Sequence, residues 1–537
     1  MSSSEKQLRK RAKPSSKPKS IAFSTIIMII GLILSKGSGF IRTVLVNITF
    51  EEQYREAFIG AFLIPDFIFA LLVGGSIQSA ITPTLSKAIE EKNQKKAWKG
   101  VSIFITWMSI FVLSFVVICE IFSNQLYQMF YQGDSEEIVR LAGNMARTLY
   151  PQIFFMMLAA LCIGVLNAYK KFGSTAFGPP VYNLFVLLAI GLLGASNNKA
   201  LYMTGFGIMI AAFIYFIFQL FMGRRELVQY RPCLDLKNPE FRRLFKLAVP
   251  ILISASIVQI NILILNSFAS RYGDGPFNAL NNASTLWQLP YGIFAVGIGN
   301  VMLPSLTTHY ANKDFKEGSK LLSTSIKNAL FLTIPCAGIF LSMPLDLVKT
   351  LLQWSSRFSN ENANMVALFL TGYCAAIVIQ SVIFIFNQAF YAIGQTRFPL
   401  FAGIVSMFVT FVLSFILVEI GCGPMCLTIS YSVACLVRMT LLALVYCRNK
   451  KLAPRRMKAF LIKSAICLIA VMGVLLLVNT VIPWDPSRKL FQFVWFGARA
   501  LLGFAVYFAM AFALKMEELQ TAYDRYLKRF FKKSVKA

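Results

Sequence analysis

The chain has 537 residues, of which 57% are hydrophobic and only 14% are charged, and its mean hydropathy is +0.63. Soluble domains carry about a quarter charged residues, so this composition excludes an ordinary soluble protein. The net charge of +29 would suit a nucleic-acid-binding protein. Most lysines and arginines, however, lie in short breaks between long apolar runs, which argues for a membrane protein and against nucleic acid as a partner.

The apolar runs predict an all-α polytopic membrane protein. A run of about 18–20 apolar residues crosses a hydrocarbon core of about 30 Å as a helix, and these runs are continuous, whereas the strands of a membrane barrel alternate. About fourteen spans are predicted, near residues 21–50, 58–86, 101–121, 141–169, 176–196, 200–222, 247–270, 277–308, 321–350, 364–392, 399–418, 424–446, 460–480 and 491–514.

The breaks between the spans alternate between strongly basic and nearly uncharged. Residues 1–20 form a basic tail before a retained first helix, because the apolar stretch that follows is too long for a signal peptide and has no small-residue cleavage site. By the positive-inside rule, the basic breaks and both termini face the cytoplasm. The basic breaks lie at residues 87–99, 170–171, 224–246, 313–320, 397, 448–458 and 515–536.

The first two spans contain charged side chains at membrane depth. Lys36 and Arg42 lie in the first span, Asp66 lies in the second, and Glu56 lies at the outer end of the second. Arg42 and Asp66 are equally far from the outer turn, and a helical rise of ~1.5 Å per residue puts both roughly 13 Å below the outer edge. They are therefore expected to face each other, with Lys36 deeper towards the cytoplasm.

Two interpretations of these charges stay open. Ionisable groups inside a membrane are costly and usually functional, which favours a cationic cavity for an anionic headgroup, with Glu56 and Asp66 balancing the charge when it is empty. The structural alternative is a buried ion pair between Arg42 and Asp66 without a role in transport. Lys36 has no acidic partner at its own depth, which favours a ligand site.

Four small or helix-breaking residues mark expected hinges or breaks near these charges. They are Gly37, Gly39, Pro65 and Pro290. Glycine is a poor helix former, and membrane helices tolerate breaks where neighbouring groups satisfy the backbone. Beside the first two glycines, Ser35 is a candidate substrate contact.

The eighth span opens with a polar stretch that includes Asn281 and Thr285. These side chains are candidates for hydrogen bonds to a sugar or phosphate, or for helix-on-helix packing. Five other charged residues lie within a few turns of an interface and are expected to snorkel to it. They are Arg147, Lys327, Arg438, Lys463 and Arg499.

The chain contains an internal repeat. Pro83-Thr84-Leu85-Ser86 and Gly173-Ser174-Thr175 recur, at equal separation, as Pro304-Ser305-Leu306-Thr307 and Gly394-Gln395-Thr396. The repeat predicts two six-helix lobes in parallel orientation, followed by two further helices. The expected organisation is a basic tail at 1–20, a first lobe at 21–222, a basic linker at 223–246, a second lobe at 247–446, two additional helices at 460–514 and a basic tail at 515–537.

This architecture is typical of a secondary transporter that binds its substrate between two lobes. No phosphate-binding GxxxxGK[ST] loop is present, which argues against an ATP-driven pump. Paired intramembrane carboxylates and histidine clusters are also missing, so we expect neither catalytic residues, a metal site nor a cofactor. The single histidine, His309, is expected in a loop, and the cysteines are scattered.

Three groups of motifs stand out in the chain. They are SKGSGFIR at residues 35–42, Ile64-Pro65-Asp66-Phe67 with residues 72–76 and 80–83, and LPYGIF at residues 289–294 with LPSL at residues 303–306. The first resembles the SRxxGFxRD opening of the MurJ/MviN family, the lipid II flippases of bacterial cell-wall synthesis. The second resembles that family's second-span block, and the third is similar to its second-half block.

The resemblance implies the multidrug/oligosaccharidyl-lipid/polysaccharide exporter fold in a bacterial cytoplasmic membrane. It implies a flippase that moves undecaprenyl-pyrophosphate-linked muropeptide to the outer leaflet, with membrane lipids and cell-wall synthesis or division proteins as partners. The last two helices would line a groove for the lipid tail. The family's essential cations map onto Lys36 and Arg42, and its outer acid maps onto Glu56.

The chain departs from the family pattern at several positions. An arginine of the family falls on Thr285, and acidic residues fall on Ser284 and Thr43; a basic pair found in some members falls on Phe69 and Ala70. The cargo is therefore expected to be lipid II or, alternatively, another lipid-linked oligosaccharide or a drug. A scaffold for cell-wall enzymes, which does not transport, is the hypothesis from a different class.

Overall fold

The computed structural model describes residues 21–72, 76–130, 135–169, 171–454, 457–482 and 488–522. All regular secondary structure in these ranges is helical. The expected N-terminal tail at 1–20 lies outside the described residues, as do Val73–Gly75 of the second-span motif and most of the C-terminal tail.

The first group of helices is called the N-terminal bundle. It consists of α2 (Ile21–Thr49), α3 (Glu52–Ala61), α4 (Leu63–Leu72), α5 (Ser76–Glu90), α6 (Gln94–Phe130), α7 (Glu136–Ala168), α8 (Phe172–Leu193) and α9 (Asn198–Met222). Contacts between α2 and α8, α7 and α9, and α6 and α7 hold this bundle together.

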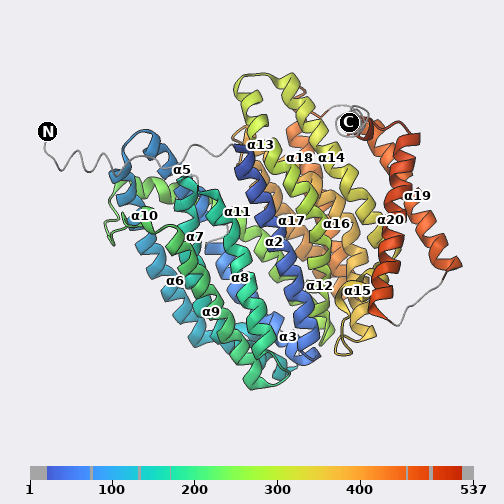
Figure 1. Cartoon of the computed structure of the whole chain (residues 1–537), viewed down its shortest axis with the longest axis horizontal. Helices are drawn as coiled ribbons and strands as arrows, with labels where there is room; N and C mark the ends of the chain where they lie inside the picture. Colours follow the sequence, from blue (N-terminus) through green and yellow to red (C-terminus); the bar gives the residue numbers. More distant parts are fainter. Residues whose placement is uncertain are drawn as a thin grey trace, which may run out of the picture.

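The second group is called the C-terminal bundle. It consists of α12 (Pro276–Pro290), the π-helix η2 (Tyr291–Ala295), α13 (Val296–Ala311), α14 (Phe315–Ser342), α15 (Pro344–Leu352), α16 (Asn360–Ala392), α17 (Arg397–Glu419) and α18 (Cys426–Cys447). Here α16 packs against α12, α14 and α18. Figure 1 shows the two bundles side by side, with α2 between them.

The remaining helices connect or follow the bundles. They are α10 (Arg224–Leu227), α11 (Pro239–Ala269), the 3-10 turn η1 (Ser270–Tyr272), α19 (Met457–Val481), α20 (Lys489–Ala513) and α21 (Glu517–Ala522). Helix α11 contacts α4, α5 and α6 on one side and α17 on the other. The expected first helix of the second lobe is therefore shared between the bundles, and it begins at Pro239, earlier than the predicted 247.

Eleven helices in the described part of the chain are long and apolar enough to cross a membrane. They account for the predicted spans from 101–121 to 200–222 and from 277–308 to 491–514. The predicted spans at 21–50, 58–86 and 247–270 lie on α2, on α3–α5 and on α11, which are not among the eleven. The chain is a multi-pass all-α membrane protein, and the count of about fourteen spans stays a prediction.

Several helices begin with a side-chain cap, because the first backbone N–H groups of a helix lack partners within it. Asn197 accepts from the amide of Ala200 at the start of α9, and Asp314 accepts from that of Glu317 at the start of α14. Asn238 caps α11, where Pro239 occupies the first helical position without an unsatisfied N–H. Polar residues in the breaks therefore set where these helices start.

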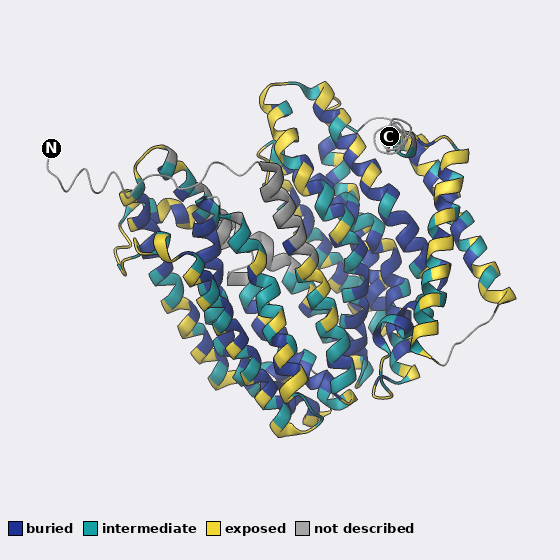
Figure 2. Cartoon of the chain, in the orientation of Figure 1, coloured by how far each residue is buried: buried dark blue, intermediate teal, exposed yellow. Residues whose placement is uncertain are grey.

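Burial follows the bundle geometry. Figure 2 shows buried residues along the inner faces of the helices and exposed residues along the outer faces. Many of the outward residues are large and apolar, such as Leu192 on α8, Ile469 on α19 and Phe512 on α20, each at least 70% exposed. In water, a surface with so many exposed apolar side chains would promote aggregation. On a membrane protein, such a surface faces lipid.

Candidate functional site

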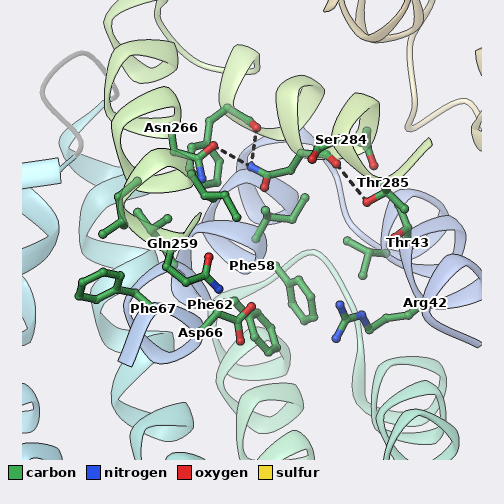
Figure 3. Close-up of a pocket in the computed structure, with 18 of the residues that line it drawn as sticks. Arg42, Thr43, Phe58, Phe62, Asp66, Phe67, Gln259, Asn266, Ser284 and Thr285 are labelled. Atoms are coloured by element: carbon green, nitrogen blue, oxygen red, sulfur yellow. Dashed lines mark hydrogen bonds between the residues drawn. The ribbon is translucent and has the colours of Figure 1, made fainter. Parts of the chain in front are cut away.

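A cavity of about 250 Å³ lies between the two bundles, where α2, α3, α4, α11 and α12 meet. We call it the central cavity (Figure 3). Its polar lining residues are Arg42, Thr43, Asp66, Gln259, Asn266, Asn281, Asn282, Ser284, Thr285 and Gln288, and aromatic rings of Phe58, Phe62, Phe67 and Phe277 complete it. Four of the residues singled out from the sequence, Arg42, Asp66, Asn281 and Thr285, thus come together.

Arg42 projects from α2 into the central cavity. Its guanidinium carbon lies 5.8 Å from the centre of the Phe62 ring, a distance at which a cation is attracted to the face of an aromatic ring. Within the described residues, Arg42 makes no hydrogen bond and no ion pair. The ring contact leaves all of its N–H donors available to a ligand.

Asp66 reaches the same cavity from the first turn of α4 (Figure 3). The second predicted span breaks at Phe62, and α4 restarts at Leu63; the amide of Asp66 donates to the Phe62 carbonyl at 2.8 Å. The Asp66 carboxylate has no hydrogen bond or ion pair with any described residue. The structural alternative, a buried ion pair between Arg42 and Asp66, is therefore not formed in this conformation.

The polar face of α12 forms the opposite wall. The Asn281 Nδ2 group donates to Asn266 Oδ1 on α11 at 3.2 Å and to the Phe277 carbonyl at 2.8 Å. The hydroxyl of Thr285 donates to the Asn281 carbonyl at 3.0 Å, which leaves its oxygen lone pairs facing the cavity. Asn281 therefore connects α12 to α11 and also lines the central cavity. Helix packing and a position open to a ligand do not exclude each other at this residue.

Lys36 and Ser35 do not line the central cavity. Lys36 is exposed, and a Cβ atom added at Gly292 would lie 3.7 Å from the Lys36 Cε atom, so the lysine side chain reaches η2 of the C-terminal bundle. The Ser35 carbonyl accepts from Asn183 Nδ2 at 3.1 Å and thereby ties α2 to α8. The two predicted cations thus occupy different places, Arg42 inside the cavity and Lys36 nearer the predicted inner end.

Glu56 lies outside the cavity as well. It is fully buried on α3, and its Oε1 atom accepts from the backbone amide of Asn278 at 3.3 Å. Asn278 is in the first turn of α12, where free N–H groups favour a negative charge. Glu56 therefore joins the two bundles at the predicted outer end.

A larger set of contacts at this end was not predicted from the sequence. Arg55 is fully buried and donates to the Arg357 carbonyl at 3.1 Å and to Asn362 Oδ1 at 2.5 Å. Asn362 in turn donates to Glu52 at 2.6 Å. We name Glu52, Arg55, Glu56, Asn278, Arg357 and Asn362 the outer latch.

Two of the four expected breaks coincide with interrupted helices. Pro65 follows the break at Phe62, and Pro290 directly precedes η2, in keeping with the missing N–H of proline. By contrast, α2 continues through Gly37 and Gly39, and nothing lies close to either glycine among the described residues. No break is present there in this conformation.

Two charged residues expected to snorkel are instead buried and paired. Arg499 is 4% exposed and binds Asp346 at 2.9 Å and Asn479 at 3.1 Å. Lys327 is 8% exposed and binds Glu518 at 3.2 Å. The prediction failed because the partners come from helices far away in the sequence.

His309 was expected in a loop but lies in the last turn of α13, with Nδ1 3.4 Å from Asp314 Oδ2. Among the described residues, no group of three or more His, Cys, Asp or Glu side chains is arranged to hold a metal ion.

Comparisons with known proteins agree on one family. The sequence model of the family described as "Lipid II flippase MurJ" matches residues 45–494. The lipid II flippase MurJ of Burkholderia cenocepacia is 28% identical over 429 residues, which cover 77% of this chain and 82% of that protein. A probable lipid II flippase MurJ of Buchnera aphidicola is 24% identical and covers 70% of this chain and 74% of that protein.

Solved structures agree on the fold. A lipid II flippase MurJ in an inward closed conformation matches with a TM-score of 0.76 and 22% sequence identity. The match covers 90% of this chain and 98% of the chain in that structure. An inward-facing multidrug resistance MATE transporter matches with a TM-score of 0.65 and 12% sequence identity. This match covers 80% of this chain and 98% of the chain in that structure.

Proposed function

The chain belongs to the lipid II flippase MurJ family, and we propose that it carries the lipid-linked peptidoglycan precursor lipid II from the inner to the outer leaflet of a bacterial cytoplasmic membrane. It is a transporter of a lipid-linked substrate in cell-wall synthesis. Both termini face the cytoplasm in this proposal, because the basic breaks lie on their side of the membrane.

The observation that carries the proposal is the Arg42 guanidinium in the central cavity between the bundles, which makes no hydrogen bond or ion pair with a described residue. A cation at membrane depth is costly without a partner, and a pyrophosphate would supply the missing charge and acceptors. Arg42 would bind the pyrophosphate of the substrate. Asp66 would balance the Arg42 charge while the cavity is empty.

The other lining residues would orient the headgroup. Asn281 and Thr285 offer hydrogen-bonding groups to a phosphate or sugar on the α12 side. Lys36, which is exposed and lies close to Gly292 of η2, would attract the headgroup as it enters. Ser35 would act through its contact with α8, and Gly37, Gly39, Pro65 and Pro290 would allow α2, α4 and α12 to bend.

Transport requires the cavity to open alternately to either side. The outer latch joins the bundles at the predicted outer end, so the present conformation is closed there. In our proposal the latch, including Glu56, breaks when the substrate is released outwards. Two six-helix lobes at 21–222 and 247–446, joined by the linker at 223–246, would move against each other, and the helices at 460–514 would hold the lipid tail.

Thr285 and Ser284 are neutral where the resemblance implies charged residues. This difference affects how the headgroup would be bound and does not change the family to which the chain belongs. The alternative, export of another lipid-linked oligosaccharide or of drugs, is not favoured, because the family model and the curated relatives all point to lipid II. Partners among cell-wall synthesis or division proteins stay a prediction.

Complementation tests the proposal. The wild-type chain should restore growth to a bacterial strain that lacks its own lipid II flippase. Arg42→Ala, present in the membrane at the same level, should not. Growth failure with a properly inserted wild-type chain would contradict the assigned cargo, and full growth with Arg42→Ala would contradict the assigned site.

A further inference from the structure

A second cavity lies apart from the central one. It has a volume of about 710 Å³ and is formed by α14, α19 and the segment that leads into α21. It lies where α19 begins and α20 ends, at the predicted cytoplasmic side of the two helices at the edge of the molecule (Figure 1). Its lining residues are Lys327, Pro454, Met457, Lys458, Ala459, Phe460, Lys463, Met516, Glu517 and Glu518.

The three lysines of this cavity are not equivalent. Lys327 is buried and neutralised, with its Nζ atom 3.2 Å from Glu518 and 3.5 Å from Glu517. Lys463 is half-buried and donates one hydrogen bond, to the Lys515 carbonyl at 3.2 Å. Lys458 is exposed and has no hydrogen bond or ion pair with a described residue. Lys458 and Lys463 therefore keep five N–H donors between them for an anion, and the three lysines outnumber the two glutamates of the lining.

An apolar stripe runs from the rim of the cavity along α19. Ile462, Ile466 and Ile469 follow the spacing of one helix face, and they are 63%, 42% and 70% exposed. Lys458 precedes Ile462 by one turn on the same face. Positive charge at the membrane surface is thus continuous with an apolar surface that points into the bilayer.

We propose that this second cavity binds the headgroup of an anionic glycerophospholipid. Lys458 and Lys463 bind its phosphate diester, and an acyl chain lies along the isoleucine stripe. Basic pockets between membrane helices on the cytoplasmic side are suited to such headgroups. A free phosphate would use the lysines but not the stripe. The site is separate from the central cavity that is proposed for the headgroup of the transported lipid.

Native mass spectrometry of the full-length, delipidated protein tests the site. Titration with phosphatidylglycerol should give specific lipid adducts and raise the thermal unfolding temperature in detergent. The double variant Lys458→Gln/Lys463→Gln should bind it more weakly, on the order of tenfold, because two cations near the headgroup are lost. The matched control, Lys450→Gln/Lys451→Gln, removes two exposed lysines that do not line the cavity and should leave binding unchanged.

Three results would overturn the proposal. Equal binding of phosphatidylcholine would show that the charge of the lipid is not recognised. Unfolding temperatures that rise as much with inorganic phosphate as with the lipid would show a free-anion site. Unchanged binding in the Lys458→Gln/Lys463→Gln variant would place the lipid elsewhere; a normal unfolding temperature of that variant without lipid verifies its fold.

Discussion

At the scale of single residues, the proposed transport mechanism depends on Arg42. Its guanidinium contacts the Phe62 ring but no described carboxylate or carbonyl. The ring lowers the cost of burying the cation without occupying its donors. Asp66 is in the same cavity and close enough to moderate the charge, yet it leaves the hydrogen-bonding positions open. Such an arrangement is suited to reversible binding of an anion.

Replacement of Arg42 by glutamine should weaken substrate binding on the order of tenfold to a hundredfold, because a charge-assisted hydrogen bond is lost. Titration of the purified protein with a water-soluble lipid II analogue measures the dissociation constant. The control Arg140→Gln removes an exposed arginine at the start of α7 and should not change it. Equal affinity of Arg42→Gln and wild type would contradict the role of Arg42.

Thr285 allows the reverse experiment, in which a positive charge is added to the central cavity. Thr285 lines the central cavity at a position where the resemblance to the family leads us to expect arginine, and Arg42 is the one cation among the described residues that line this cavity. Thr285→Arg should therefore tighten binding of the same analogue several-fold, since it adds a second charge-assisted contact. Weaker binding than wild type would mean that this chain holds the headgroup elsewhere.

At the scale of elements, interruptions decide where charges lie. The break at Phe62 starts a new helix whose first turn carries Asp66, and the π-helix after Pro290 brings Gly292 close to Lys36. Proline made both breaks predictable from the sequence. Gly37 and Gly39 did not break α2, because glycine only weakens a helix by about 1 kcal/mol, and the rest of α2 stays helical around them.

The two C-terminal helices are fixed to the C-terminal bundle by Arg499. It pairs with Asp346 on α15, binds Asn479 on α19, and lies 5.2 Å from the Trp495 ring centre. Arg499→Gln should lower the free energy of unfolding by roughly 2 kcal/mol, less than the roughly 3–5 kcal/mol of a fully buried pair, because Asp346 is partly exposed. Thermal unfolding in detergent measures this change.

Two further variants separate the ion pair from a general effect of losing an arginine. Arg147→Gln, at an exposed position of α7, should change stability by less than about 0.5 kcal/mol. Asp346→Asn should destabilise wild type but have little further effect in Arg499→Gln, because the interaction is already lost. Additive effects would show that the two side chains do not stabilise the protein together.

At the scale of the whole molecule, the outer latch joins the two bundles at the predicted outer end. Arg55 is fully buried between the bundles, and its partners Arg357 and Asn362 belong to the C-terminal half. Removal of one partner leaves other buried polar groups unsatisfied, which costs about 1–3 kcal/mol each. Two conformations of a transporter differ by only a few kcal/mol, so this cost is large enough to shift their populations.

Arg55→Ala should therefore increase the population that is open at the outer end. Spin labels at Tyr54 and Ser359, on either side of the latch, would report a longer distance in the variant by pulsed electron paramagnetic resonance. The control Lys199→Ala, at an exposed position of the same end, should keep the short distance. A short distance in Arg55→Ala as well would mean that other contacts close this end.

The sequence predicted the membrane class and the helical architecture from hydropathy, and it placed Arg42 and Asp66 at the same depth from helix geometry. Asn281 and Thr285 were candidates for ligand contact or for helix packing, and only the structure brings them to the same cavity. The sequence did not predict the latch, since Arg55 and Asn362 are far apart in the chain and look like ordinary loop residues. It also favoured one cationic cavity for Lys36 and Arg42, whereas Lys36 lies near Gly292 of η2 and is not among the residues that line the central cavity. Long-range packing decides such details.

The most direct test measures lipid II in the outer leaflet of cells depleted of their own flippase. Expression of the wild-type chain should restore lipid II that an external, membrane-impermeant probe can reach, and Arg42→Gln at an equal membrane level should not. Lipid II that stays inaccessible with the wild-type chain, or becomes equally accessible with Arg42→Gln, would contradict an account in which this cation carries the headgroup across the membrane.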